Sequence, residues 1–93
     1  MNGLDLKTKY FLTIEEIETS DLYELLLEDE SNSEERNHCL RMFNGAISIL
    51  AKRLRNNDLE REFTEKEQDV LNFVFNAIEE FKMLNGMLQL ILL

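Results

Sequence analysis

One histidine and one cysteine stand side by side in the chain, and both residue types can do chemistry. Glu35 and His38 have the Glu-x-x-His spacing that di-iron carboxylate proteins place on bundle helices. Such a site needs two of these motifs and two further glutamates, whereas His38 is the only histidine of the chain. Cys39 is a poor partner for His38, because adjacent residues of a helix point about 100° apart. The sequence therefore favours a structural or exposed His38 and a buried, inert Cys39.

The segment 56–67 carries acidic residues at the spacing of a calcium-binding loop. Counted from Asn56 as position 1, carboxylates fall at positions 3, 5, 7 and 12, on Asp58, Glu60, Glu62 and Glu67. Arg61 occupies the position that requires glycine for the sharp turn, and asparagine replaces the aspartate expected first. A register that starts at Asp29 ends on Leu40 instead of a glutamate. We therefore predict no metal site, no other cofactor and no catalytic residue.

Ten carboxylates lie between Lys9 and Arg36, and no Lys or Arg lies among them. They are Glu15, Glu16, Glu18, Asp21, Glu24, Glu28, Asp29, Glu30, Glu34 and Glu35. One interpretation is a solvated face, whose charge the basic side chains of residues 36–61 partly neutralise by pairing within the molecule. The other is a binding surface for a protein with a basic surface, because complementary charge speeds encounter and sets orientation. For that surface we predict Glu24, Glu28, Asp29, Glu30, Glu34 and Glu35, which we call the acidic face.

The composition describes a small acidic chain. Its 93 residues carry a formal net charge of −9 and are 44% hydrophobic, which is typical of a globular protein rather than a disordered one. A field of this sign repels phosphate backbones and anionic lipid surfaces, so we expect no direct nucleic-acid binding and no membrane association. A single cysteine excludes an internal disulfide, and the first residues lack a secretory pattern. These features predict a cytoplasmic protein made of one domain over residues 1–93.

Turn-forming residues are scarce, since the chain has three glycines and no proline. We therefore predict an all-α fold, a small three- to four-helix bundle with a long apolar C-terminal helix. Ser33 is the expected N-cap of a helix over residues 34–55, whose last turn carries the basic residues Lys52, Arg53 and Arg55 at the negative end of the helix dipole. Thr64 with Glu67 forms a capping box before a helix that runs from residue 65 to the C-terminus.

The sequence of the N-terminal third is compatible with more than one arrangement of helices. A capping box at Thr13 predicts a helix that begins near Ile14. Before it, residues 1–12 fit either an extended arm or a helical turn. Ser20 offers a second start, either for a separate helix over residues 21–30 or within one continuous helix. The expected buried stripe of that segment consists of Leu22, Leu25 and Leu26.

From Phe81 onward the predicted C-terminal helix is apolar on nearly every side. A domain of this size can hardly surround one of its own helices, so we expect part of that surface to lie in an interface. The predicted homo-oligomer interface consists of Phe81, Leu84, Met87, Leu88, Ile91 and Leu92.

These features together predict a non-enzymatic interaction module, which binds another protein, inhibits or regulates it, and acts as a homo-oligomer. The alternative is an acidic mimic of nucleic acid that occupies the basic cleft of a nucleic-acid enzyme, in the manner of anti-restriction and anti-CRISPR proteins. In its size, acidity and helical pattern the chain is similar to stand-alone inhibitors, immunity proteins and secretion chaperones, and no motif selects one of them.

Overall fold

Four helices make up the fold. The computed structural model describes the backbone of residues 3–92 and the side chains of residues 5–92. Its helices are α1 (Gly3–Glu18), α2 (Asp21–Glu28), α3 (Glu34–Arg55) and α4 (Glu65–Leu92), and no strand occurs in the described range. The predicted all-α helical bundle is therefore confirmed.

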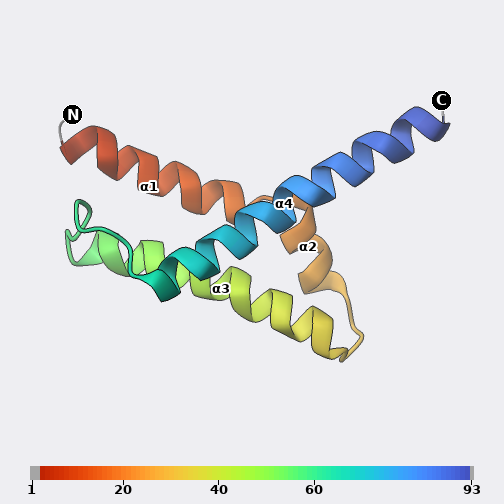
Figure 1. Ribbon diagram of the computed structural model, residues 1–93, viewed down its shortest axis with the longest axis horizontal. Coiled ribbons are helices and arrows are strands. Elements are labelled where there is room, and N and C mark those ends of the chain that lie inside the picture. The colour runs from red at the N-terminus through yellow and green to blue at the C-terminus, as the bar shows by residue number, and fades with distance from the viewer. Residues whose placement is uncertain (1–2, 93) are drawn as a thin grey trace.

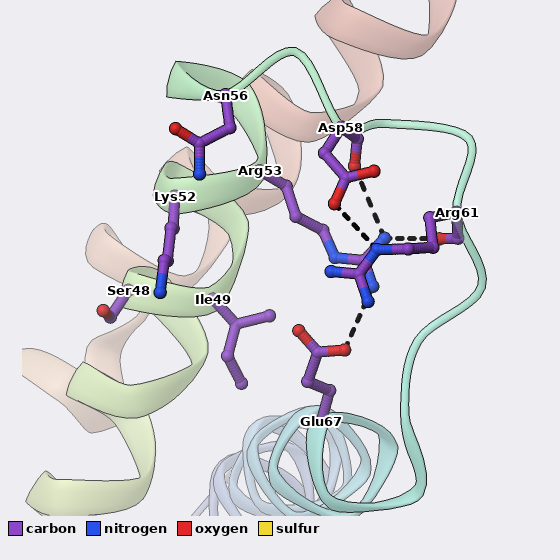
Figure 2. Close-up of a pocket in the computed structure, with 8 residues that line it drawn as sticks. All are labelled: Ser48, Ile49, Lys52, Arg53, Asn56, Asp58, Arg61 and Glu67. Carbon is purple, nitrogen blue, oxygen red and sulfur yellow. Dashed lines mark hydrogen bonds and ion pairs between the residues drawn. The ribbon is translucent and has the colours of Figure 1, made fainter.

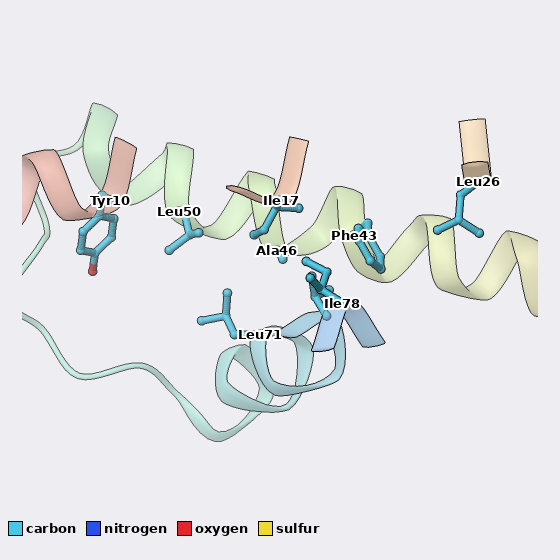
Figure 3. Close-up of a cluster of buried hydrophobic side chains, with 9 residues drawn as sticks. Tyr10, Ile17, Leu26, Phe43, Ala46, Leu50, Leu71 and Ile78 are labelled. Carbon is cyan, nitrogen blue, oxygen red and sulfur yellow. The ribbon is translucent and has the colours of Figure 1, made fainter. Parts of the chain in front are cut away.

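α3 packs against each of the other helices, α1, α2 and α4, and runs along the lower edge of the view in Figure 1. Its residues Phe43, Ala46 and Leu50 recur at steps of three and four, which places them on one face toward the core. The buried hydrophobic residues, drawn in Figure 3, are Tyr10, Ile17, Leu26, Phe43, Ala46, Leu50, Leu71, Val74 and Ile78. α4 supplies the last three, and its C-terminal half extends beyond the other helices (Figure 1).

The predicted starts of the two long helices α3 and α4 are confirmed. The Ser33 hydroxyl accepts a hydrogen bond from the Arg36 N–H at 3.2 Å, which caps α3. At α4 the Thr64 N–H donates to Glu67 Oε1 at 2.8 Å, and the Glu67 N–H donates to Thr64 Oγ1 at 3.2 Å. This reciprocal pair is a complete capping box, and it satisfies two backbone N–H groups near the helix start.

The helix start expected near Ile14 is wrong, because α1 already begins at Gly3. The Thr13 hydroxyl donates to the Lys9 carbonyl at 2.7 Å, one turn back along the same helix, and does not act as a cap. Neither an extended arm nor a single helical turn describes the segment before it, and residues 1–2 lie outside the described range.

Contacts with distant parts of the chain account for the longer α1. Leu6, Tyr10 and Ile17 recur at helical spacing, and all three pack on the core. Tyr10 is buried, and its hydroxyl donates to the carbonyl of Leu59, in the loop after α3, at 3.1 Å. This packing supplies the stabilisation that a short helix lacks by itself.

The second start, at Ser20, is confirmed, and it begins a separate short helix. The Ser20 hydroxyl accepts a hydrogen bond from the Tyr23 N–H at 3.3 Å, and α2 ends at Glu28, short of the expected residue 30. The expected buried stripe consists of Leu22, Leu25 and Leu26. Its first and last members pack on the core, whereas Leu25 is 50% exposed, so the stripe is wrong at that residue. A helix this short has one narrow buried face, and the ring of Tyr23 stacks on Phe43 beside it.

We predict different outcomes for the two Thr-x-x-Glu motifs when each threonine is replaced by alanine. Thr64→Ala removes the N-cap of α4 and should lower the free energy of unfolding by about 1 kcal/mol. Thr13→Ala removes a hydroxyl that bonds only within its own helix, and alanine is the better helix former, so the change should stay within about 0.5 kcal/mol. Urea unfolding followed by circular dichroism measures both values. Equal losses would contradict the assignment of Thr64, and not Thr13, as a cap.

Candidate functional site

Arg53 is a buried charged residue, with 3% of its surface exposed. Its side chain extends from the last turn of α3 toward the following loop and the start of α4 (Figure 2). Nη2 donates to the carboxylate of Glu67 at 3.0 Å and to the carbonyl of Glu62 at 3.0 Å. Nη1 donates to the carbonyls of Arg61 and Asp58. One side chain therefore connects α3, the loop and α4.

The guanidinium of Arg53 plays the part that an ion plays in a calcium-binding loop. Three backbone carbonyls of the loop converge on it, together with the carboxylate of Glu67 at loop position 12. The ring of Phe63 lies against the guanidinium, 4.2 Å from its central carbon to the ring centre. Within residues 3–92 no three His, Cys, Asp or Glu side chains lie together in a way that could hold a metal ion.

Hydrogen bonding keeps this ion pair charged. The Thr64 N–H, and after it the Arg53 guanidinium, lower the pKa of Glu67 by donating to its carboxylate, against the opposing effect of burial. Burial by itself lowers the pKa of Arg53, but its hydrogen bonds and ionic attraction, first of all with Glu67, outweigh burial and raise that pKa. A hollow of about 310 Å³ borders the pair, and there Arg61 Nε binds Asp58 Oδ2 at 2.7 Å. We interpret this group of residues as structural, because its charged side chains bind one another.

All ten carboxylates of residues 15–35 belong to exposed residues. The ion pairs of the described side chains join Arg53 to Glu67, Arg61 to Asp58 and Lys82 to Glu79, and none includes a carboxylate of this segment. The interpretation that basic side chains of residues 36–61 neutralise the segment by direct pairing is therefore wrong. The acidic face lies on α2, on the loop after it and on the first turn of α3. That it binds a partner stays a prediction.

Several of these carboxylates lie where the dipole of their own helix is unfavourable to a negative charge. The last turn of α1 contains three glutamates, Glu28 ends α2, and neither last turn contains a basic residue. A carboxylate near a helix C-terminus meets the negative end of the helix dipole, which is unfavourable. After α2 the carboxylate of Asp29 accepts a hydrogen bond from the Ser31 N–H at 2.9 Å, and this bond lowers the pKa of Asp29. The carboxylates at the C-terminal ends therefore do not serve the stability of α1 or α2, whereas Asp21 and Glu24 lie in the first turn of α2, which favours acidic side chains.

The C-terminal part of α4 carries the largest group of exposed apolar side chains. Seven of its residues are each 55–84% exposed, and we call them the apolar tip: Met83, Leu84, Met87, Leu88, Leu90, Ile91 and Leu92. The apolar tip includes five of the six residues predicted for the homo-oligomer interface, and the sixth, Phe81, is only partly exposed. Within residues 3–92 no helix combines the length and the apolar character that a membrane span requires.

His38 and Cys39 contact neighbouring apolar side chains. His38 is exposed, and its ring meets Phe73 edge to face with 5.3 Å between the ring centres. Cys39 is a free thiol that packs against the core but is only partly buried, so the expectation of a buried thiol holds in part. Sequence reasoning missed the role of Arg53, although its place three residues after Leu50, on the apolar stripe of α3, is a signal of burial. Comparisons of the chain with family models, with curated proteins and with solved structures find no match.

We predict that Glu67→Gln lowers the free energy of unfolding by about 1–2 kcal/mol at neutral pH, because a neutral amide cannot balance the buried charge of Arg53. The pKa of Glu67 in the folded protein lies below its ordinary value of 4.5, so the unfolded chain binds the proton more tightly. The carboxylate therefore stabilises the fold fully above that value, and its contribution is lost as the pH falls through the folded pKa.

Urea unfolding at several pH values should show the difference between wild type and Glu67→Gln shrinking as the solution becomes more acidic than pH 4.5. Glu65→Gln is the matched control, since Glu65 is exposed in the same helical turn and binds no arginine in the described chain. A loss in Glu67→Gln no larger than in this control would contradict the role of the Arg53–Glu67 pair.

We predict that calcium leaves the protein unchanged. Arg53 already binds the oxygens of the loop, and Arg61 stands where the loop would need glycine. Calorimetric titration with calcium up to about 1 mM should give only heats of dilution, and the midpoint of thermal unfolding should not move. Micromolar binding would contradict this and would make the segment 56–67 a metal site.

Proposed function

We propose that this protein is a non-enzymatic interaction module, which binds another protein through the acidic face. What supports the proposal is the state of the six carboxylates: all are exposed, and none forms an ion pair with a described Lys or Arg. Charges in that state are available to a partner without the loss of ion pairs within the chain. A partner with a clustered basic surface fits them, because opposite charge raises the rate of encounter and fixes the orientation of the complex.

The cost of the acidic residues to their own helices also supports the proposal. Carboxylates that serve solubility alone can lie anywhere on the surface, whereas Glu28 and Asp29 of the acidic face lie at the C-terminal end of α2, where the helix dipole disfavours them. Residues that weaken their own fold are expected at functional surfaces more than elsewhere. Glu24, Glu34 and Glu35 lie instead in the first turns of α2 and α3, which favour acidic side chains.

The proposal assigns no reaction to the protein. Arg53 and Glu67 bind each other, the ring of His38 contacts Phe73, and Cys39 lies against the core. These contacts give each side chain a structural role. A free thiol fits a reducing compartment, and we propose the cytoplasm.

A second candidate function is an acidic mimic of nucleic acid, which occupies the basic cleft of a nucleic-acid enzyme. The series of ten exposed carboxylates without an intervening base favours it, because such an array resembles a row of phosphates. The two candidates differ in their dependence on salt. Mimicry through many charge contacts should lose affinity steeply between about 50 and 200 mM salt, whereas an interface with few ion pairs should lose little.

We predict that reversal of Glu24, Glu28, Asp29 and Glu30 to lysine abolishes partner binding and leaves the helix content near that of the wild type. The four residues are exposed and their carboxylates form no ion pair with described bases, so the fold does not depend on such pairs. Affinity capture from a lysate of the native host, followed by mass spectrometry, compares the proteins that the wild type and the variant retain.

The matched control reverses four other exposed acidic residues, Glu60, Glu62, Glu65 and Asp69, and changes the net charge by the same amount. The expected result is a protein that the wild type and the control retain and the acidic-face variant does not. Equal retention by both variants would favour a solvated face instead. A loss of folding stability confined to the acidic-face variant would mean that these carboxylates serve the fold.

A further inference from the structure

α4 changes the character of its faces along its length. In its first half Leu71, Val74 and Ile78 are buried in the core. At about 100° per residue, Asn85 and Gln89 continue the direction of Ile78 to within about 20°. The side that faces the core in the first half therefore carries Asn85 and Gln89 at its centre in the second half, with Leu92 beside them in the direction of Val74.

The apolar residues of the second half lie on the opposite side of α4. Met87 falls about 180° from Ile78 around the helix. Four more members of the apolar tip lie within about 60° of Met87, namely Met83, Leu84, Leu90 and Ile91. All five are more than half exposed. They form a second apolar face, directed away from the core, and do not simply continue the stripe that the core covers.

The spacing of this second face reads the same in both directions. Its members lie four and three residues before Met87 and three and four residues after it. A second copy of the helix, related by a two-fold axis at Met87, therefore runs antiparallel and presents the matching pattern. Met83 then meets Leu90 of the second copy, Leu84 meets Ile91, and Met87 meets itself.

The distribution of charge favours the same arrangement. Residues 83–93 contain no charged side chain, so two tips can approach without repulsion between like charges. In a parallel pair two strongly acidic bodies would lie side by side, whereas in an antiparallel pair they lie at opposite ends. At 1.5 Å per residue, the two copies of Phe81 are then about 18 Å apart along the axis, beyond the Debye length of about 8 Å at physiological salt.

The exposed area is sufficient for a dimer. The exposed fractions of the five residues of the second apolar face, 57–76%, amount to roughly 600 Å² on each copy. Covering this face on both copies buries roughly 1,200 Å², which is the lower limit of specific interfaces. Interfaces at that limit include weak, reversible ones, and we expect the pair to dissociate at concentrations on the order of micromolar.

We propose that two copies of this chain pair through the apolar tip, as an antiparallel helix pair centred on Met87. The pairing does not depend on what the acidic face binds. It leaves Ile78 and the core contacts of α4 in place, so each copy keeps the fold described above.

Sedimentation equilibrium between about 1 and 100 µM should show the wild type as a monomer–dimer system. Leu84→Glu with Ile91→Glu should raise the dissociation constant about 100-fold, because the pair would bury carboxylates, and should leave the helix content unchanged, because both residues are exposed in the monomer. Asn85→Glu with Gln89→Glu is the matched control: it adds the same charge on the other side of the same turns and should remain dimeric.

Disulfide trapping in a Cys39→Ala background tests the antiparallel orientation. Met87→Cys should form a covalent dimer with itself. Met83→Cys should not, since its two copies lie about 12 Å apart along the axis, but a mixture of Met83→Cys and Leu90→Cys should. Efficient trapping of Met83→Cys alone would overturn the antiparallel pair. The proposal would be overturned by a wild type that stays monomeric at 100 µM, whether or not that monomer binds lipid vesicles. It would also be overturned if both glutamate variants weakened the dimer equally.

Discussion

A guanidinium removed from water needs acceptors for its N–H groups, and this requirement of Arg53 shapes the junction of α3, the following loop and α4. Both Nη atoms of Arg53 are bonded there, whereas its buried Nε has no partner among the described residues. The acceptors come from the loop after α3 and from the first turn of α4, so one side chain fixes the end of one helix, the path of the loop and the start of the next. Glu67 joins the N-cap contact of Thr64 to the same network, and Tyr10 ties α1 to the loop through the carbonyl of Leu59. An acidic loop thus obtains its positive charge from a side chain of the same molecule.

This network also determines where α4 leaves the rest of the fold. The helix is held at its start by the capping box and in its middle by Ile78, which packs into the core beside α3. α4 has 28 residues, whereas the last of its buried residues is Ile78, so the helix continues for more than three turns beyond the core. The exposure of the apolar tip follows from this difference in length. Five of its seven residues point away from Ile78, and this direction follows from the order of residues in the tip itself.

The range of each interaction decides how much of this structure the sequence could predict. Helix caps act over three residues, and for that reason the starts of α2, α3 and α4 are predictable. The same local motif misleads at Thr13, because α1 is extended by packing that includes a bond from Tyr10 to a loop 49 residues away. For Arg53 the sequence gives two conflicting signals about exposure. Its residue type indicates a cation exposed at a helix end, whereas its spacing from Leu50 indicates a buried side chain. The exposure of the acidic face is readable from composition, but the direction of the apolar tip relative to the core is not, because it requires the position of Ile78.

The net charge of the chain and its apolar tip have opposite effects on association between copies. An exposed apolar stripe promotes association, whereas a net charge of −9 repels other copies wherever their charged surfaces approach. The neutral tip escapes this repulsion, and an antiparallel two-fold pair uses each tip once and leaves none for a third copy. In the proposed pair, the closed two-fold symmetry therefore limits the assembly to two copies. The direction of the stripe makes the pair compatible with the proposed function, because a copy bound on the side opposite to Ile78 does not separate α4 from α3, and the acidic face lies on other segments, namely α2, the loop after it and the first turn of α3.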